Sequence, residues 1–190
     1  MSERRGNLFM FAPKFHPSLR RVGDVRRSLG IRTCLNLLGI LSNPAGAPKQ
    51  TIGVLHPSLI ELMAKSPALL GIEKAWVVHG SDGLDEITLT GKTFVAEVSN
   101  GKVKNFSIST KDFGLQSGEI KHLKVETAEQ SAKIIKEILA SKHRDEARSL
   151  VGGGISKEPM PAARLAEQRI DSHSAQVKLE RLIQTINRKS

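Results

Sequence analysis

Apolar and polar positions along the chain follow two periods, one typical of strands and one typical of helices. Short apolar runs of strand length occur at residues 50–55 and 74–80, and a helical pattern at 56–71 lies between them. Pro67 is expected to end or kink that helix. Strand, helix and strand in this order predict a βαβ unit with parallel strands.

Two further strands are predicted at residues 86–98 and 102–108, where apolar side chains alternate with polar ones. They are joined through Ser-Asn-Gly, and an Asn-Gly pair between alternating segments predicts a β-hairpin. After a loop, residues 127–142 show a helical pattern that starts with a capping box formed by Thr127 and Gln130. The predicted apolar face of this helix consists of Ile134, Ile135, Ile138 and Leu139.

Further helices are predicted in the first quarter and in the last part of the chain. Residues 24–30 start with an Asp suited to an N-cap and end with a glycine suited to a C′ position. Closing helices are predicted at 162–170 and 174–186, whereas residues 149–161 are rich in glycine and proline and show no regular pattern.

The first quarter also contains a buried apolar stretch at residues 33–41, followed by a loop at 42–48. Together the patterns predict an α/β fold: a mainly parallel sheet flanked by helices, with an added β-hairpin. The length of 190 residues fits a single α/β domain over residues 1–190.

Composition narrows the class of partners. The net charge of +10 is concentrated in residues 1–50, which hold nine Lys or Arg against two Asp or Glu. A basic face of this kind attracts nucleic acid or a small anionic substrate. With 4% aromatic residues and no Tyr, the chain lacks the stacking residues that single-strand binders use, so no nucleic-acid partner is expected.

The single cysteine, Cys34, excludes an intramolecular disulfide and lies in an apolar run, where we interpret it as a core residue. No apolar run approaches the roughly 20 residues that span a bilayer, and no signal-peptide pattern occurs. A cytoplasmic protein without a membrane partner is the expectation.

The stretch AWVVHGSDGLDEI, residues 75–87, carries the most distinctive candidate chemistry. A buried strand ends in His79-Gly80, and after a glycine turn Asp85 and Glu86 stand side by side. Ligands bind α/β sheets in the loops after the carboxyl ends of strands, and Mg²⁺ takes one or two carboxylates together with waters and a substrate phosphate. The residues alone leave two interpretations open, a magnesium site or a solvated turn. His79 is interpreted as structural.

The basic segment at residues 16–33 offers a second candidate site. An arginine there, Arg26 or Arg27, could hold a carboxylate through two parallel hydrogen bonds, a geometry that lysine does not match. A solvated helix face is the alternative.

Three ordered stretches resemble the second half of anthranilate phosphoribosyltransferases: FMFAPKFHPSLRRVGDVRRSLGIRTCLNLLGILSNPAG (9–46), QTIGV (50–54) and AWVVHGSDGLDEI (75–87). The likeness extends to about Arg148 and resumes at 157–183. This resemblance implies a fold of the nucleoside phosphorylase and phosphoribosyltransferase type, glycosyltransferase family 3. It also implies the transfer of a phosphoribosyl group from phosphoribosyl pyrophosphate to anthranilate in tryptophan biosynthesis, with Mg²⁺.

The resemblance also implies roles for particular residues. Arg26 matches the arginine that holds the anthranilate carboxylate, and His16 and Gly39 match residues along the anthranilate path. Asp85 and Glu86 match the acidic pair that binds Mg²⁺ against the pyrophosphate. No side chain is required as a covalent nucleophile, so no catalytic residue in that sense is expected.

The chain departs from the family pattern at several places. Ile40 stands where the family has a proline in GPLTNPA, and SLVGGGIS stands where an Asn- and Ala-rich helix is expected. The family's small helical domain, which forms its homodimer, and its pyrophosphate-binding GTGGD-type loop have no counterpart in these residues. We therefore expect little unaided turnover. The alternatives are a non-catalytic remnant or binding module of the same fold, or a protein like the pyrimidine nucleoside phosphorylases, which share a similar NLLGxLxNPA stretch.

Overall fold

The computed structural model describes most of the chain, and its internal contacts divide the chain into two units. These units are Met1–Pro48 and Lys49–Ser190. The single-domain organisation expected for residues 1–190 stays a prediction. The described residues are 15, 28, 30, 35–43, 45–119, 121, 124–140 and 159–187.

The described part of the first unit centres on one short helix, α4 (Leu35–Leu41), within the predicted apolar stretch. Leu38 is 45% exposed, so the expectation of a uniformly buried stretch is wrong for this side chain. A turn follows, in which the Asn43 side chain accepts from the backbone N–H of Ala45. Of the helix predicted at 24–30, Gly30 has the positive φ of 62° expected of a C′ glycine. Cys34 lies outside the described residues.

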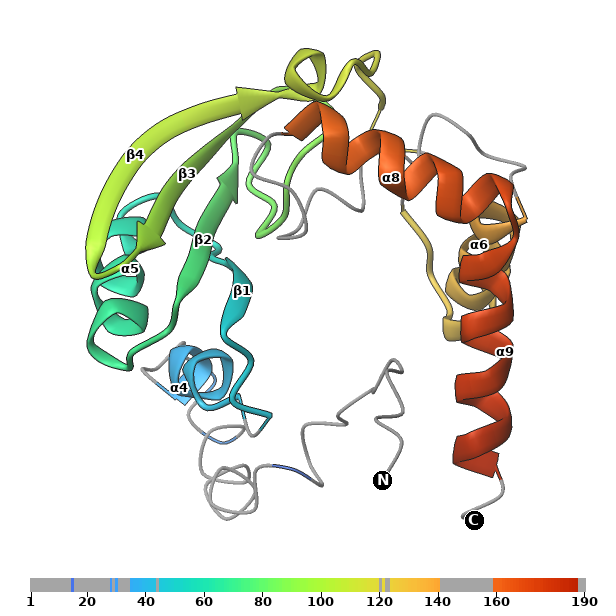
Figure 1. Cartoon of the computed structure of the whole chain (residues 1–190), viewed down its shortest axis with the longest axis horizontal. Helices are drawn as coiled ribbons and strands as arrows, with labels where there is room; N and C mark the ends of the chain where they lie inside the picture. Colours follow the sequence, from blue (N-terminus) through green and yellow to red (C-terminus); the bar gives the residue numbers. More distant parts are fainter. Residues whose placement is uncertain are drawn as a thin grey trace. The chain divides into compact units, whose positions relative to one another are not determined.

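The second unit is built on a four-stranded sheet in the order β1-β2-β3-β4 (Figure 1). Its strands are β1 (Lys49–Gly53), β2 (Lys74–Gly80), β3 (Lys92–Ser99) and β4 (Lys102–Ser109). Only β1 and β2 are parallel, whereas β2–β3 and β3–β4 are antiparallel. The α/β class is confirmed. The expectation of a mainly parallel sheet is wrong for the described residues, because the hairpin is part of this same sheet.

Helix α5 (Leu59–Leu69) forms the crossover between the two parallel strands and packs against β2 and β3 (Figure 1). Met63 and Ala64 of this helix are buried, and so are Val77 of β2 and Val98 of β3. Fully burying an aliphatic side chain of this size contributes about 1.5–3 kcal/mol, so this layer is a major source of stability. The helix continues through Pro67 and ends two residues later.

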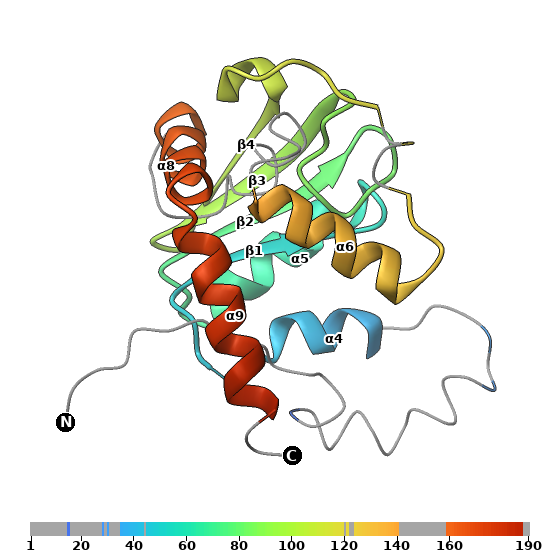
Figure 2. The same ribbon diagram turned by 90° about the vertical axis from the view of Figure 1, so that its right-hand side faces the viewer.

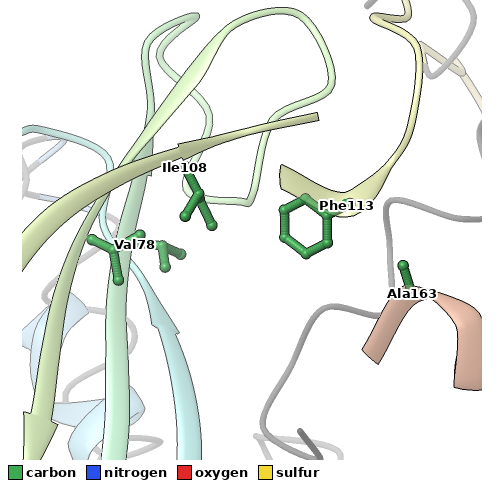
Figure 3. Packing of buried hydrophobic residues seen from close by; sticks show 5 residues of the cluster. Val78, Ile108, Phe113 and Ala163 are labelled. Carbon is green, nitrogen blue, oxygen red and sulfur yellow. The ribbon is translucent and has the colours of Figure 1, made fainter. Parts of the chain in front are cut away.

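A second core cluster joins the sheet to elements far along the chain. Phe113, in the short 3-10 helix η1 (Thr110–Phe113), lies between Ile108 of β4 and Ala163 of α8 (Pro159–Asp171) (Figure 3). Helix α8 starts at Pro159, three residues before the start predicted from the sequence. Proline is well tolerated in the first turn of a helix, so Pro159 and Pro161 do not prevent this earlier start. The irregular segment predicted up to residue 161 is wrong for its last three positions; residues 149–158 lie outside the described residues.

The remaining helices of the described residues are α6 (Ala128–Leu139) and α9 (Ser174–Asn187). Helix α9 follows α8 after a bend at His173 (Figure 2). The predicted cap of α6 is present, since the Gln130 N–H donates to the Thr127 hydroxyl at 3.2 Å. In a capping box the Gln130 side chain would accept from the backbone N–H of Thr127. Here it accepts from the backbone N–H of Glu126, the preceding residue. In the predicted apolar face, Ile138 is buried against Ile170, but Ile135 is 47% exposed.

Candidate functional site

The acidic pair lies on the connection from β2 to β3, which we call the acidic loop (residues 81–91). Because β1 and β2 are parallel, their carboxyl ends meet at one edge of the sheet, and the acidic loop starts there, directly after Gly80. Asp85 and Glu86 are both exposed. The predicted strand at 86–98 starts only at Lys92, so Glu86 belongs to the loop and not to the hairpin.

Gly53, the last residue of β1, brings that strand against the acidic loop. A Cβ atom added at Gly53 would overlap the carbonyl oxygen of Asp85, so only glycine allows the two backbones to lie this close. The contact places the acidic pair over the end of β1 as well as that of β2. The acidic pair is therefore located by a residue more than thirty positions earlier in the chain.

His79 holds the ends of the same two strands together. The ring is buried, 6% exposed, and its Nδ1 lies 2.8 Å from the carbonyl oxygen of Val54, to which it donates. The Val54 N–H donates in turn to the carbonyl of Val78 at 3.0 Å. This geometry agrees with the structural interpretation of His79, because the imidazole is committed to the backbone.

Asp82 is the centre of a hydrogen-bond network within the acidic loop. Its Oδ2 accepts from the hydroxyl groups of Thr88 and Thr90, the latter at 2.7 Å, and its Oδ1 accepts from the Leu84 N–H at 3.2 Å. Thr88 is itself held, since its N–H donates to the Thr93 hydroxyl of β3 at 2.9 Å. The network links the start of the loop to its end.

The pKa values of Asp82 and Glu86 are shifted in opposite directions. Displacement of water by protein atoms is the largest influence on Asp82 and would raise its pKa, but the hydrogen bonds from Thr88, Thr90 and Leu84 together outweigh it and lower that pKa. The pKa of Glu86 is raised, first by partial desolvation and second by the adjacent Asp85 carboxylate. Asp85 and Glu86 thus form a pair of like charges that a bound cation would stabilise.

The donor set fits Mg²⁺. Two exposed carboxylates are hard oxygen ligands, and Mg²⁺ takes one or two of them while keeping several waters and bridging to phosphate. Among the described residues no group of three or more His, Cys, Asp or Glu side chains could hold a metal ion. A cavity of about 490 Å³ lies between α6 and α9, and its lining does not include Asp85 or Glu86.

The other predicted site residues stay predictions. His16 and Arg26 lie outside the described residues. Gly39 lies in the middle of α4, in the other unit, and is partly buried. Sequence reasoning missed Gly53 and Asp82, and the only signal for Gly53 was a glycine at the end of a predicted strand.

Fold and site together define an α/β protein with a carboxylate pair at the carboxyl ends of two parallel strands. A model of the "Glycosyl transferase family, a/b domain" matches residues 1–157, and the chain belongs to this family. Among the described residues, no helix is long and apolar enough to cross a membrane.

Two curated relatives illustrate the similarity. The anthranilate phosphoribosyltransferase of Bradyrhizobium diazoefficiens is 42% identical over 187 residues, which cover 94% of this chain and 56% of the relative. That of Rhodopseudomonas palustris (strain HaA2) is 43% identical over 183 residues, 92% of this chain and 54% of the relative. The chain thus spans about half the length of the curated relatives it matches.

Solved structures agree with this result. A magnesium-bound variant of anthranilate phosphoribosyltransferase from Saccharomyces cerevisiae has a TM-score of 0.85 at 27% identity, covering 97% of this chain and 56% of that one. The same enzyme in complex with PRPP and Mg has a TM-score of 0.83 at 28% identity, covering 95% and 54%. The described backbone is therefore similar to that of the yeast enzyme.

Proposed function

We propose that this chain provides the α/β part of an anthranilate phosphoribosyltransferase and contributes its magnesium-binding carboxylates. The observation that carries the proposal is the exposed pair Asp85 and Glu86, placed at the carboxyl ends of two parallel strands by the contact with Gly53. Membership of the glycosyl transferase family and the names of the relatives support the choice of reaction.

In the proposed role, Asp85 and Glu86 hold Mg²⁺. The ion, when bound, supplies positive charge that stabilises the pyrophosphate leaving group. The chain's own contribution is to hold the two carboxylates on an ordered loop before the ion arrives. The anthranilate carboxylate is bound by Arg26, and His16 and Gly39 line the path of anthranilate. No side chain of the chain acts as a covalent nucleophile.

The partners follow from those of the relatives. The yeast structures were determined with PRPP and Mg and with 4-fluoroanthranilate, which supports phosphoribosyl pyrophosphate and anthranilate as the substrates here. A cytoplasmic location and a role in tryptophan biosynthesis belong to the same proposal. So does homodimer formation through the helical domain that the family carries outside this match.

Turnover is proposed to need more than the residues described. The relatives are nearly twice as long as the matched part. The resemblance to the family implies that its pyrophosphate-binding loop belongs to the rest of that length. Removing a single preorganised donor from an enzyme's oxyanion site costs ~10²–10³ in rate, so a loop that supplies several such donors contributes more. Ile40, in place of the family proline, is a further change at the anthranilate pocket.

The test follows the fluorescence of anthranilate, which falls on phosphoribosylation. The purified chain is mixed with anthranilate, phosphoribosyl pyrophosphate and Mg²⁺, alone and together with the N-terminal segment of the Bradyrhizobium diazoefficiens relative as a separate chain. We expect loss of fluorescence in the complemented mixture. The double variant Asp85→Asn/Glu86→Gln should abolish it, because it removes both anionic ligands and changes side-chain size little.

The control variant is Asp112→Asn, which neutralises a carboxylate that caps η1 by accepting from the N–H and hydroxyl of Ser109. It should react like the unchanged chain. If neither the chain nor the complemented mixture consumes anthranilate while the full-length relative does, the enzyme proposal is overturned. A non-catalytic binding module would then be the better interpretation.

A further inference from the structure

The network around Asp82 closes a ring across the part of the acidic loop that carries the two exposed carboxylates. Asp82 lies before them, Thr88 and Thr90 lie after them, and both hydroxyl groups donate to the same oxygen, Oδ2. Residues 83–87 are therefore enclosed between two anchored points. We propose that Asp82 is a positioning residue, which holds the acidic loop so that Asp85 and Glu86 present their carboxylates together to a divalent cation.

The contacts distinguish Asp82 from a metal ligand. Its carboxylate is partly buried and accepts three hydrogen bonds, from Thr88, Thr90 and the Leu84 N–H. Asp85 and Glu86 are exposed instead. A carboxylate whose oxygens are occupied by protein donors orients the groups around it, in the way that outer partners of metal ligands do.

Backbone bonds tighten the same part of the loop. The Gly80 N–H donates to the carbonyl of Leu84 at 2.8 Å, and the Gly83 N–H donates to that of Gly80 at 2.9 Å. Gly83 has a φ of 90°, in the left-handed region that glycine adopts without strain. Asp82 and these bonds together hold the backbone that leads into Asp85, so the pair is ordered before a cation binds. The inference rests on the proposed function, because it assigns the pair to a cation.

The affinity test titrates the full chain with Mn²⁺ and follows the electron paramagnetic resonance signal of the free ion. Asp82→Asn should weaken Mn²⁺ binding by about 10-fold, since mutation of residues that orient metal ligands typically lowers metal affinity ~10–100-fold. The asparagine side chain presents one acceptor oxygen in place of two, so it cannot accept from the threonine hydroxyl groups and from the Leu84 N–H through separate oxygens. The control Asp112→Asn makes the same chemical change at a cap outside the loop and should bind like the unchanged chain.

Thr90 supplies a matched pair of variants at an exposed position, where the fold tolerates substitution. Thr90→Val keeps the shape and removes the hydroxyl, and we expect about 5-fold weaker Mn²⁺ binding. Thr90→Ser keeps the hydroxyl and should stay within about twofold of the unchanged chain. Circular dichroism shows whether Asp82→Asn folds. If it does not fold, the two Thr90 variants still test whether the hydrogen bonds to Asp82 support Mn²⁺ binding.

Amide hydrogen exchange measures the order of the loop without any metal. Asp82→Asn should accelerate exchange at the Leu84 amide, which donates to Asp82, by at least about 10-fold, while the amides of β3 remain unchanged. A role confined to global stability would instead move both sets of amides together. Unchanged exchange at Leu84, or Thr90→Val binding Mn²⁺ as tightly as Thr90→Ser, would overturn the positioning role.

A different set of results would contradict the proposed function and not the role of Asp82. If Asp85→Asn/Glu86→Gln binds Mn²⁺ as well as the unchanged chain, or if the unchanged chain binds no Mn²⁺, the metal assignment itself is wrong. The exchange result at Leu84 then still decides whether Asp82 orders the loop.

Discussion

Two connections of the same sheet are built in contrasting ways. The β3–β4 turn uses two residues, Asn100 and Gly101, with φ of 50° and 74°, so left-handed backbone conformations shape it. The acidic loop between β2 and β3 spans residues 81–91 and is held by side-chain hydrogen bonds to Asp82 and by the contact with Gly53. The first connection depends on local chemistry, and the second depends on residues distant in the chain.

The contrast shows where chemistry is placed on this fold. A tight hairpin turn joins two strands and leaves little room for exposed groups with a defined arrangement. The acidic loop holds two exposed carboxylates because its ends are anchored by Asp82 and its middle rests on β1. Four substitutions test this contrast, from the largest expected effect to the smallest.

Gly53→Ala should have the largest effect. The new Cβ would overlap the backbone of Asp85, and overpacking of this kind costs about 1–3 kcal/mol, with this case at the upper end. Urea unfolding should show the loss of stability, and Mn²⁺ titration should show weaker binding. The matched control is Gly118→Ala, where the added Cβ meets the Leu89 side chain at an ordinary 3.5 Å. Equal unfolding midpoints for the two variants would contradict the close-contact argument.

Gly101→Ala should come next. Alanine in a left-handed conformation costs about 1–2 kcal/mol, so the free energy of unfolding should fall by that amount. Mn²⁺ binding should remain the same, because the hairpin turn takes no part in holding the acidic loop. Asn100→Gly serves as the control and should lie within about 0.5 kcal/mol of the unchanged chain. A weakened Mn²⁺ affinity in Gly101→Ala would show that the two connections are not independent.

Glu97→Gln tests the strands that both connections share. Glu97 accepts from the Trp76 indole at 2.7 Å and pairs with Lys74 at 2.9 Å. Desolvation would raise its pKa, but these two partners prevail and lower it below 4.5. A lowered pKa means that the stabilisation is complete above the unfolded-state value near 4.5 and is lost as the pH falls through the folded-state value.

The variant should therefore cost about 1 kcal/mol at pH 7 and remove part of the loss of stability on acidification below about pH 4.5. Urea unfolding between pH 3 and 7 measures both effects. A variant that loses stability on acidification as steeply as the unchanged chain would show that Glu97 is not the titrating group.

Ser81→Ala should have the smallest effect. The Ser81 hydroxyl oxygen accepts from the Lys92 N–H at 3.1 Å, but the bond is exposed and water replaces it readily. We expect a loss of about 0.5 kcal/mol in urea unfolding and unchanged Mn²⁺ binding. If Ser81→Ala weakens Mn²⁺ binding as much as Asp82→Asn does, order in the loop is spread over many bonds and not concentrated at Asp82.

Much of the fold could be predicted from local patterns. The Asn-Gly turn, the cap at Thr127 and the strand that ends at Gly80 were all predicted, because each depends on a few neighbouring residues. The order of the strands in the sheet was harder to predict from the sequence. The hairpin adds to β2 by antiparallel pairing, and no local pattern specifies which strand it joins.

The site was predictable in its composition and not in its placement. The pair Asp85 and Glu86 could be found from its position after a strand and from the resemblance to a family. That the same pair lies against the end of β1 could not, because Gly53 meets it only in the folded chain. Asp82 was passed over for a related reason: the hydroxyl groups it binds were assigned to a strand, although Thr88 and Thr90 lie in the loop.

The sequence by itself determined the α/β class, the hairpin and the two carboxylates, since side-chain chemistry and backbone preferences are properties of neighbouring residues. The tertiary structure decided that the sheet is mixed, that Gly53 supports the acidic pair, and that Asp82 binds across the loop. These features depend on contacts between distant residues, which form only when the packing of α5 and the pairing of the strands bring their backbones together.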